Sequence, residues 1–85
     1  MTYKCPCCGN YTFRDPPDIS IAYICPVCCW ENDVFITADD EPSDENGGIT
    51  LVDAKKNYKA YGASRKKLLR MVRSPTPEEI AANES

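Results

Sequence analysis

Two pairs of cysteines, each with two residues between its members, are the part of the chain best suited to chemistry. Cys5 and Cys8 form the first pair, and Cys25 and Cys28 form the second after sixteen intervening residues. A Cys-x-x-Cys turn, or knuckle, supplies two sulfur ligands from one tight loop, and two knuckles match the template for a four-thiolate metal site. Zn²⁺ is bound tetrahedrally by four sulfurs at about 2.3 Å. We therefore predict that these four residues bind one zinc ion.

The same four sulfurs allow other chemistry. A rubredoxin-like iron site uses the same ligand set, because tetrahedral sulfur coordination suits iron as well as zinc, and such a protein would transfer electrons. A thioredoxin-like redox couple would use one Cys-x-x-Cys beside a βαβ pattern, which this chain lacks. Structural disulfides are typical of secreted proteins, and the first residues have no signal-peptide pattern. We favour zinc and keep iron as the alternative.

Two further cysteines, Cys7 and Cys29, are left over. Cys29 directly follows the second pair, whereas Gly9 follows the first, at a place where a tight loop often needs a positive φ. One hypothesis makes both cysteines reactive or redox-sensing thiols. We favour the alternative that they pack as small hydrophobic groups, because no neighbouring residue in the sequence would activate them. A swap of Cys7 for Cys8, or of Cys29 for Cys28, would lose the Cys-x-x-Cys turn.

The composition excludes several classes of function. The 85 residues include six cysteines and no histidine, which excludes Ser-His-Asp catalysis, Cys-His catalysis and a Cys₂His₂ zinc finger. Carboxylates are abundant only between residues 39 and 45, where nothing in the sequence makes the chain rigid, and a catalytic site needs preorganised groups. We therefore do not expect an enzyme. With no signal peptide and no apolar run long enough to span a bilayer, we expect a cytoplasmic protein that does not bind membranes.

The net charge of −3 conceals an uneven distribution. Residues 1–50 carry two basic and nine acidic side chains, residues 51–73 carry eight basic and one acidic, and the remaining segment adds three glutamates. Such segregation indicates charged contact surfaces, so we predict that the chain binds another protein. The candidate contact residues are the acidic Asp39, Asp40, Glu41, Asp44 and Glu45 and the basic Arg65, Lys66, Lys67, Arg70 and Arg73.

Nucleic acid is the alternative partner, since lysine and arginine neutralise phosphates. The basic residues available for this are Lys55, Lys56, Lys59, Arg65, Lys66, Lys67, Arg70 and Arg73. However, the sequence pI of about 4.8 is far below that of typical nucleic-acid-binding domains. The basic segment can also pair with the acidic loop of the same chain. We therefore rank a protein partner first.

Hydrophobic patterning predicts the elements that position the cysteines. Alternating or β-branched residues indicate strands at 11–14, 19–24 and 34–36, and the first two strands each adjoin a knuckle. Paired strands would bring both knuckles to one end of a hairpin, as a shared metal ion requires. Trp30 should pack across the knuckles or the small core.

Two helices should follow the strands. Thr50 and Asp53 are spaced like a capping box at the start of the first helix, and Gly62 suits its C-terminal cap. The apolar stripe of this helix comprises Leu51, Ala54, Tyr58 and Tyr61. A second helix is predicted over 64–72, where Leu68, Leu69 and Val72 can face inward. The prolines that follow should end it.

These elements predict a small α+β fold: a zinc-ribbon-like or rubredoxin-like three-stranded antiparallel sheet with two C-terminal helices. We expect a single zinc-binding domain over residues 1–73, which divides into a ribbon (1–36), an exposed acidic loop (37–49) and a helical part (50–73). Residues 74–85 form a tail, with one helical turn or disorder. Four thiolates leave no open position on the metal, so the site should be structural.

Several motifs occur together in this chain. They are Cys5-Pro-Cys-Cys-Gly9, Tyr23-Ile-Cys-Pro-Val-Cys28, Trp30-Glu31-x-Asp33, Gly47-Gly48, Asn57-Tyr58 and Tyr61-Gly62-Ala63. In this combination the chain resembles the small bacterial cysteine-rich CPCC family, from which it departs at Cys29. The resemblance implies a short intracellular zinc-binding protein and supplies no reaction. By analogy with other small acidic bacterial proteins, its interaction with a partner could be immunity-like or antitoxin-like.

Overall fold

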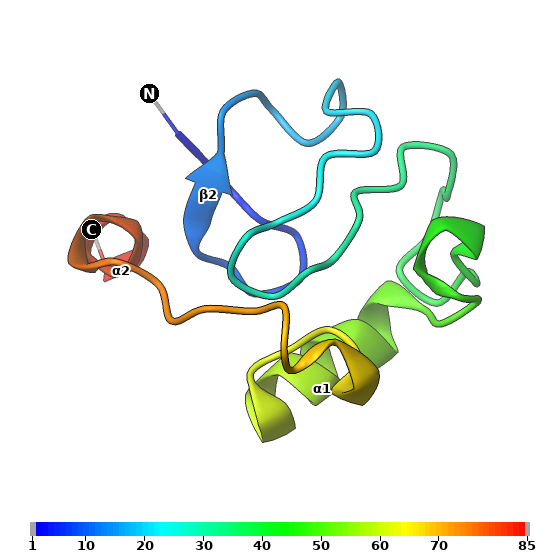
Figure 1. The fold of residues 1–85 in the computed structure, drawn as a ribbon. Coiled ribbons are helices and arrows are strands. Elements are labelled where there is room, and N and C mark those ends of the chain that lie inside the picture. Colours follow the sequence, from blue (N-terminus) through cyan, green and yellow to red (C-terminus); the bar gives the residue numbers. More distant parts are fainter. Residues whose placement is uncertain (1, 85) are drawn as a thin grey trace.

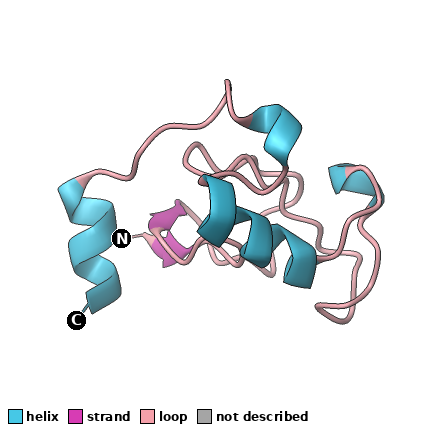
Figure 2. Cartoon of the chain, turned by 90° about the horizontal axis from the view of Figure 1, so that it is seen from below, coloured by secondary structure: helices cyan, strands magenta, loops and turns pink. Residues whose placement is uncertain are grey.

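The computed structural model describes residues 2–84, and the side chains of residues 2–80. In chain order the regular elements are β1 (Tyr3–Lys4), β2 (Tyr11–Phe13), the 3-10 turn η1 (Asp44–Asn46), α1 (Leu51–Tyr61), the 3-10 turn η2 (Lys66–Leu68) and α2 (Pro77–Glu84). The fold is a small α+β arrangement with a two-stranded sheet, two helices and long loops (Figures 1 and 2). Between residues 2 and 84, neither helix has the length and hydrophobicity needed to cross a lipid bilayer.

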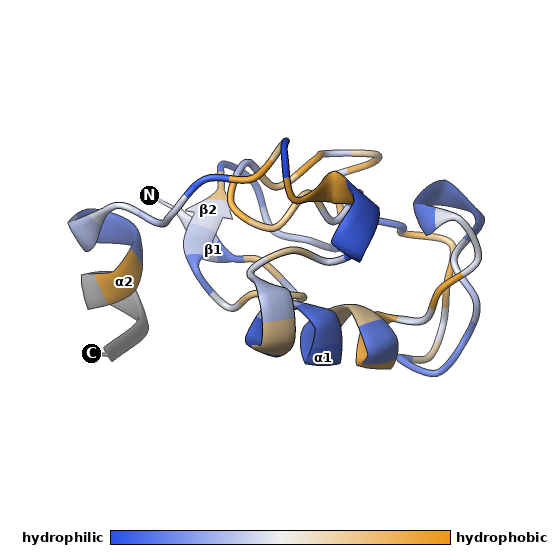
Figure 3. Cartoon of the chain, turned by 60° about the horizontal axis from the view of Figure 1, so that its bottom comes forward, coloured by the Kyte–Doolittle hydropathy of each residue, from blue (hydrophilic) through white to orange (hydrophobic). Residues whose placement is uncertain are grey.

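The prediction of a three-stranded sheet is wrong. β1 and β2 pair antiparallel and are the only strands in the described part of the chain. Segments 19–24 and 34–36 are turns and loops, apart from an isolated β-bridge at Ile24. Tyr23 and Ile36 pack against the core. Other apolar side chains of these segments lie outside it, since Ile21 is 68% exposed and Phe35 is 75% exposed. Figure 3 accordingly shows hydrophobic residues, in orange, along the loops as well as in the helices.

Side-chain hydrogen bonds hold the first of these segments as a loop. The amide nitrogen of Asn32 donates to the carbonyl oxygens of Pro17, at 2.6 Å, and Ser20, at 2.9 Å. The Ser20 hydroxyl donates to the carbonyl oxygens of Asp15 and Pro16. Backbone groups that would pair with a neighbouring strand are therefore satisfied by side chains. The isoleucines of segment 19–24 favour a strand, but no strand forms because no second sheet or helix covers them.

The hydrophobic core combines side chains from both knuckles, β2 and α1. Trp30 and Phe13 are its largest fully buried members, and Val27 packs with them. Leu51 and Ala54 contribute the buried face of α1. Trp30 is 1% exposed, which confirms the prediction that it packs in the core with the knuckles. So few large apolar side chains give a chain of this size little hydrophobic stabilisation, and a metal often supplements such a core.

The helix predicted after Thr50 is confirmed as α1. The Thr50 hydroxyl accepts a hydrogen bond from the backbone N–H of Asp53 at 3.0 Å, as an N-cap does. At the other end Gly62 has a φ of 87°, and its N–H donates to the carbonyl oxygen of Tyr58. The predicted apolar stripe fails only at its last member, Tyr61, which is largely exposed.

The second predicted helix, over 64–72, is wrong. Ser64 is fully buried, and its backbone N–H donates to the carbonyl oxygen of Cys28 at 2.8 Å. Arg65 is then extended, with φ of −138° and ψ of 139°. Because the chain is tied to the second knuckle at Ser64, it makes only the single turn η2 before it becomes irregular again.

The second helix of the fold, α2, lies in the C-terminal segment and packs beside β2 (Figures 1 and 2). A capping box begins it. The backbone N–H of Glu79 donates to the Thr76 hydroxyl, and the backbone N–H of Thr76 donates to the Glu79 carboxylate at 2.8 Å. Both guanidinium nitrogens of Arg73 donate to the same carboxylate at 3.0 Å. This ion pair lowers the pKa of Glu79.

The acidic loop is anchored by two buried polar residues. Asn46 and Ser43 are both 0% exposed, so the expectation of a fully exposed loop is wrong at these positions. The Asn46 side chain accepts from the backbone N–H of Glu31 and donates to its carbonyl oxygen, at 2.9 and 2.8 Å. It therefore occupies the place that a neighbouring strand would take. The Ser43 hydroxyl donates to Asp33 and accepts from Asn46.

Replacing Asn46 should destabilise the fold. Asn46→Ala removes three hydrogen bonds and leaves buried polar groups unpaired, so we expect the free energy of unfolding to fall by about 2 kcal/mol. Denaturant titration in excess zinc would measure the change. The control Asp44→Ala, an exposed position in the same turn, should alter the value by no more than about 0.5 kcal/mol. Equal effects of the two substitutions would contradict the anchoring role.

Candidate metal centre

The structure brings together the four cysteines predicted to be ligands. The Sγ atoms of Cys5, Cys8, Cys25 and Cys28 all lie within 4.8 Å of one another. Cys5 Sγ is 3.6 Å from Cys28 Sγ, and Cys8 Sγ is 3.8 Å from Cys25 Sγ. Four sulfurs at about 2.3 Å from a central zinc ion stand roughly 3.8 Å apart in a tetrahedron. The cluster therefore has the size and the donor atoms for a thiolate-binding metal ion.

The first knuckle is a closed backbone turn between β1 and β2. The N–H of Cys5 donates to the carbonyl oxygen of Asn10, and the N–H of Gly9 donates back to the carbonyl oxygen of Cys5, both at 2.9 Å. Gly9 has a φ of 78°, in the left-handed region that glycine enters without steric cost. Within this turn the side chains of Cys5 and Cys8 are directed toward the same point, and that of Cys7 is not part of the cluster.

The second knuckle repeats this pattern with one difference. The N–H of Cys25 donates to the carbonyl oxygen of Trp30, and the N–H of Cys29 donates to that of Cys25. Cys29 is therefore the counterpart of Gly9 and has a φ of 64°. A non-glycine residue in this region costs roughly 1–2 kcal/mol, so the turn is held in spite of the strain at Cys29. Ordered packing around the cluster must offset that cost.

Hydrogen bonds within the cluster favour the thiolate form of Cys25. The thiols of Cys28, Cys5 and Cys8, in that order, hold the pKa of Cys25 below its usual range by hydrogen bonding to its thiolate. The Thr12 hydroxyl, 3.1 Å from Cys25 Sγ, adds to this stabilisation. An anionic sulfur among closely spaced thiols attracts a soft cation.

Most of the four-sulfur cluster is buried. Cys5, Cys25 and Cys28 are buried in the hydrophobic core, whereas Cys8 is partly exposed. With Cys7, Cys8 borders a surface groove that α1 completes with Tyr58 and three lysines. All four sulfurs point at one another, and a metal bound by all of them would have no position left for substrate.

The two spare cysteines lie outside the four-sulfur group. Cys7 is buried in the core, and Cys29 is partly buried. Burial, followed by the charge of Cys25, raises the pKa of Cys29. A raised pKa disfavours the thiolate, which is the reactive form. This supports packing rather than redox chemistry for Cys29.

The acidic residues predicted to contact a partner remain near the surface. Asp39, Asp40, Asp44 and Glu45 are exposed, and Glu41 is partly buried. Glu41 accepts hydrogen bonds from the backbone and hydroxyl of Thr37. Among the described residues, the predicted pairing of the acidic loop with the basic segment is limited to one ion pair, between Lys55 of α1 and Asp39 at 3.7 Å.

The basic residues do not form one continuous face. The guanidinium of Arg65 lies against Gly47. A Cβ atom added at Gly47 would be 2.6 Å from Nη1 of Arg65. Lys66 lies over the ring of Tyr61 at 5.6 Å. Arg73 is engaged by Glu79 beside α2. Lys67 and Arg70 are exposed, and the lysines at 55, 56 and 59 border the groove beside the first knuckle.

Thr12 is the residue at this site that the sequence analysis missed. It lies in β2 and is buried, and no pattern in the sequence distinguishes its hydroxyl from that of any strand threonine. Only the packing of β2 against the second knuckle brings it to Cys25.

Comparison with known proteins agrees with the cysteine pattern. A family model described as cysteine-rich CPCC matches residues 3–79, which include all six cysteines. No curated protein and no solved structure matches the chain.

The Thr12 hydroxyl should raise the affinity of the four-cysteine site for zinc. Thr12→Val removes the hydrogen bond to Cys25 at nearly constant volume, and losses of this kind lower metal affinity by about tenfold or more. Thr12→Ser keeps the hydroxyl and should bind almost as tightly as the unchanged protein. Competition with a zinc chelator of known affinity would measure both. If valine and serine proteins hold zinc equally well, the hydroxyl has no such role.

Proposed function

The chain belongs to the cysteine-rich CPCC family, and on that premise we propose that it is a non-enzymatic module, stabilised by one zinc ion, that binds another protein. The observation that carries the proposal is a set of large apolar side chains at the surface of a chain with a very small core. Soluble chains seldom expose contiguous apolar groups without a binding role.

Zinc in a structural role is supported by the geometry of the four sulfurs. Their separations suit tetrahedral coordination, and closed four-cysteine sites are the structural kind. Iron in the same site would imply electron transfer, and the sulfur distances accommodate both ions. We favour zinc because a structural metal ion would stabilise a fold whose hydrophobic core is small, whereas no other feature of the described residues points to a redox role. We also propose a cytoplasmic location, where thiols stay reduced.

The proposed contact surface is an apolar patch made of Ile19, Ile21, Val34 and Phe35. Ile21 borders two adjoining hollows, one shared with Ile19 and the other with Val34 and Phe35. Three of these four side chains are more than 60% exposed. Burying them against a partner would remove apolar area from water, which is the main favourable term in association.

Carboxylates border the apolar patch. Glu45 and Asp33 line the same hollow as Phe35, and a hydrogen bond with Glu45 raises the pKa of Glu31. Crowded acidic groups favour a partner that brings lysine or arginine. Within residues 2–80, the only ion pairs join Lys55 to Asp39 and Arg73 to Glu79, so these carboxylates are not neutralised. An immunity-like or antitoxin-like role would be one form of this interaction.

Nucleic-acid binding has less support. A polyanion would be recognised by a continuous basic surface, whereas the basic side chains here are dispersed over α1, η2 and the segment before α2. Catalysis also lacks support, because no described cluster combines an open metal position with preorganised acid and base groups.

The metal assignment predicts one zinc ion per chain. Elemental analysis of protein purified under reducing conditions should find zinc at a ratio of one, and Cys25→Ser should lose both zinc and cooperative unfolding, because metal binding supplies folding free energy. Cys29→Ser, in the same turn but outside the four-sulfur group, should keep the zinc. Stoichiometric iron, or full zinc in Cys25→Ser, would reject the assignment.

The interaction surface predicts a specific loss of binding. The double substitution Ile21→Ser and Phe35→Ser should weaken the binding of a stoichiometric, cross-linkable partner by about thirtyfold or more, since buried apolar anchors dominate such interfaces. Zinc content should be unchanged, because both side chains are exposed. Met71→Ser is the matched control, because Met71 is also highly exposed but lines neither hollow of the apolar patch. Equal partner binding by the two proteins would refute the apolar patch as the contact surface.

A further inference from the structure

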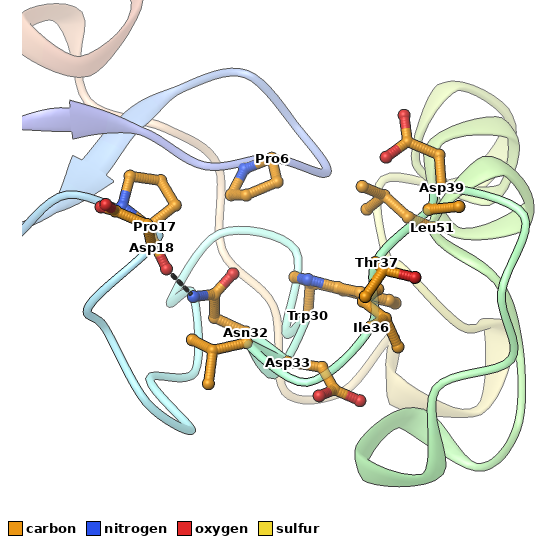
Figure 4. A pocket seen from close by; sticks show the side chains of 12 residues that line it. Pro6, Pro17, Asp18, Trp30, Asn32, Asp33, Ile36, Thr37, Asp39 and Leu51 are labelled. Atoms are coloured by element: carbon orange, nitrogen blue, oxygen red, sulfur yellow. Dashed lines mark hydrogen bonds between the residues drawn. The ribbon is translucent and has the colours of Figure 1, made fainter.

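A pocket of ≈ 310 Å³ lies beside the first knuckle and the start of α1, distinct from the four-sulfur cluster (Figure 4). Pro6, Pro17, Ile36 and Leu51 give it apolar walls, and Trp30 lies among them. Its volume is near the lower limit for ligand pockets. The pocket can therefore hold one or two residues of a peptide rather than a large ligand.

Trp30 presents an unused donor to this pocket. The residue is 1% exposed, yet among the described residues no acceptor bonds its indole N–H. Figure 4 shows the ring nitrogen at the end of the indole that faces the middle of the pocket. The fully buried, unpaired side-chain atoms of the described residues are Ser64 Oγ and Arg65 Nε, so the unpaired Trp30 nitrogen keeps some accessible surface. A ligand acceptor in the pocket can therefore reach this N–H.

Asn32 presents an unused acceptor to the same space. It is 5% exposed, and its amide nitrogen donates to two carbonyl oxygens, those of Pro17 and Ser20. Because both partners are acceptors, the nitrogen must face them and the oxygen must face away. Figure 4 shows this oxygen directed toward the side of the pocket where the Trp30 nitrogen lies. No donor from the described residues bonds it.

The rim of the pocket is acidic. Asp18, Asp33 and Asp39 all border it, and among them only Asp39 has an ion pair in the described chain, with the exposed Lys55. Asp33 is held in place by hydrogen bonds from the backbone N–H of Phe35 and the Ser43 hydroxyl. Such a rim repels phosphate and attracts lysine or arginine.

We propose that this pocket binds an extended segment of the partner protein through one peptide group. The carbonyl oxygen of that group accepts from the indole N–H of Trp30, and its N–H donates to the side-chain oxygen of Asn32. A neighbouring apolar side chain lies against Leu51 and Ile36, and a basic residue reaches Asp18 or Asp39. The inference rests on the proposed role as a protein-binding module, and it names the chemistry of the partner.

The test uses the zinc-loaded full chain and the probe N-acetyl-leucyl-lysinamide. Trp30 is the only tryptophan, so its indole N–H cross-peak in a ¹H–¹⁵N NMR spectrum reports occupancy of the pocket without ambiguity. We expect this peak to move in a saturable way. An ester analogue, in which oxygen replaces the N–H between leucine and lysine, should bind about tenfold more weakly, because it leaves the Asn32 oxygen unpaired.

A blocking variant separates binding in the pocket from binding elsewhere. Ala38 is exposed and borders the pocket, so Ala38→Leu should fill the space without disturbing the core and should abolish the saturable shift. Ala60→Leu, the same change at an exposed position of α1, should leave the shift intact.

Three outcomes would overturn the inference: no shift of the Trp30 peak, equal affinity for amide and ester, or unchanged binding in Ala38→Leu. If Ile21→Ser with Phe35→Ser still releases the partner in any of these cases, the proposed function survives and only the assignment of the pocket fails. If the apolar patch variant also has no effect, both fail.

Discussion

Four sulfur atoms converging on one point are the constraint on which the rest of the structure depends. The two knuckles come from separate parts of the chain, and each is closed by its own backbone hydrogen bonds. Around them, Thr12 from β2 approaches Cys25, and Ser64 after α1 donates its N–H to Cys28. The sheet and the helix are therefore tied to the cluster directly. A metal ion held by these four sulfurs would give so small a core the stabilisation that a larger domain gains from apolar burial.

Side-chain amides form the hydrogen bonds with loop backbone groups that a neighbouring strand would otherwise form. Asn46 satisfies both backbone groups of Glu31, and Asn32 holds the loop that precedes the second knuckle. The protein thus fixes its loops without covering their apolar residues, so Ile21 and Phe35 stay at the surface. The same arrangement leaves the oxygen of Asn32 free to face the Trp30 pocket. Loop architecture and the proposed binding surfaces have one physical origin.

Local features were predictable where the interaction spans only a few residues. The N-cap at Thr50, the C-cap at Gly62 and the two knuckles all depend on residues within one turn. The capping box of Thr76 and Glu79, which begins α2, also spans a single turn, but the sequence analysis did not identify it. Cys29 shows the limit of such rules, since its left-handed backbone is imposed by the turn in a residue that does not favour it.

The sequence by itself determined the four cysteines of the cluster, their spacing and the first helix, because these follow from short-range geometry and from the chemistry of thiols. It also indicated which residues are apolar, but not which of them are buried. Tertiary structure alone decided that the isoleucines near 20 lie at the surface, that Asn46 replaces a strand, and that Ser64 prevents a second helix over 64–72. These outcomes rest on hydrogen bonds between distant residues, and such bonds leave no periodic trace in the sequence.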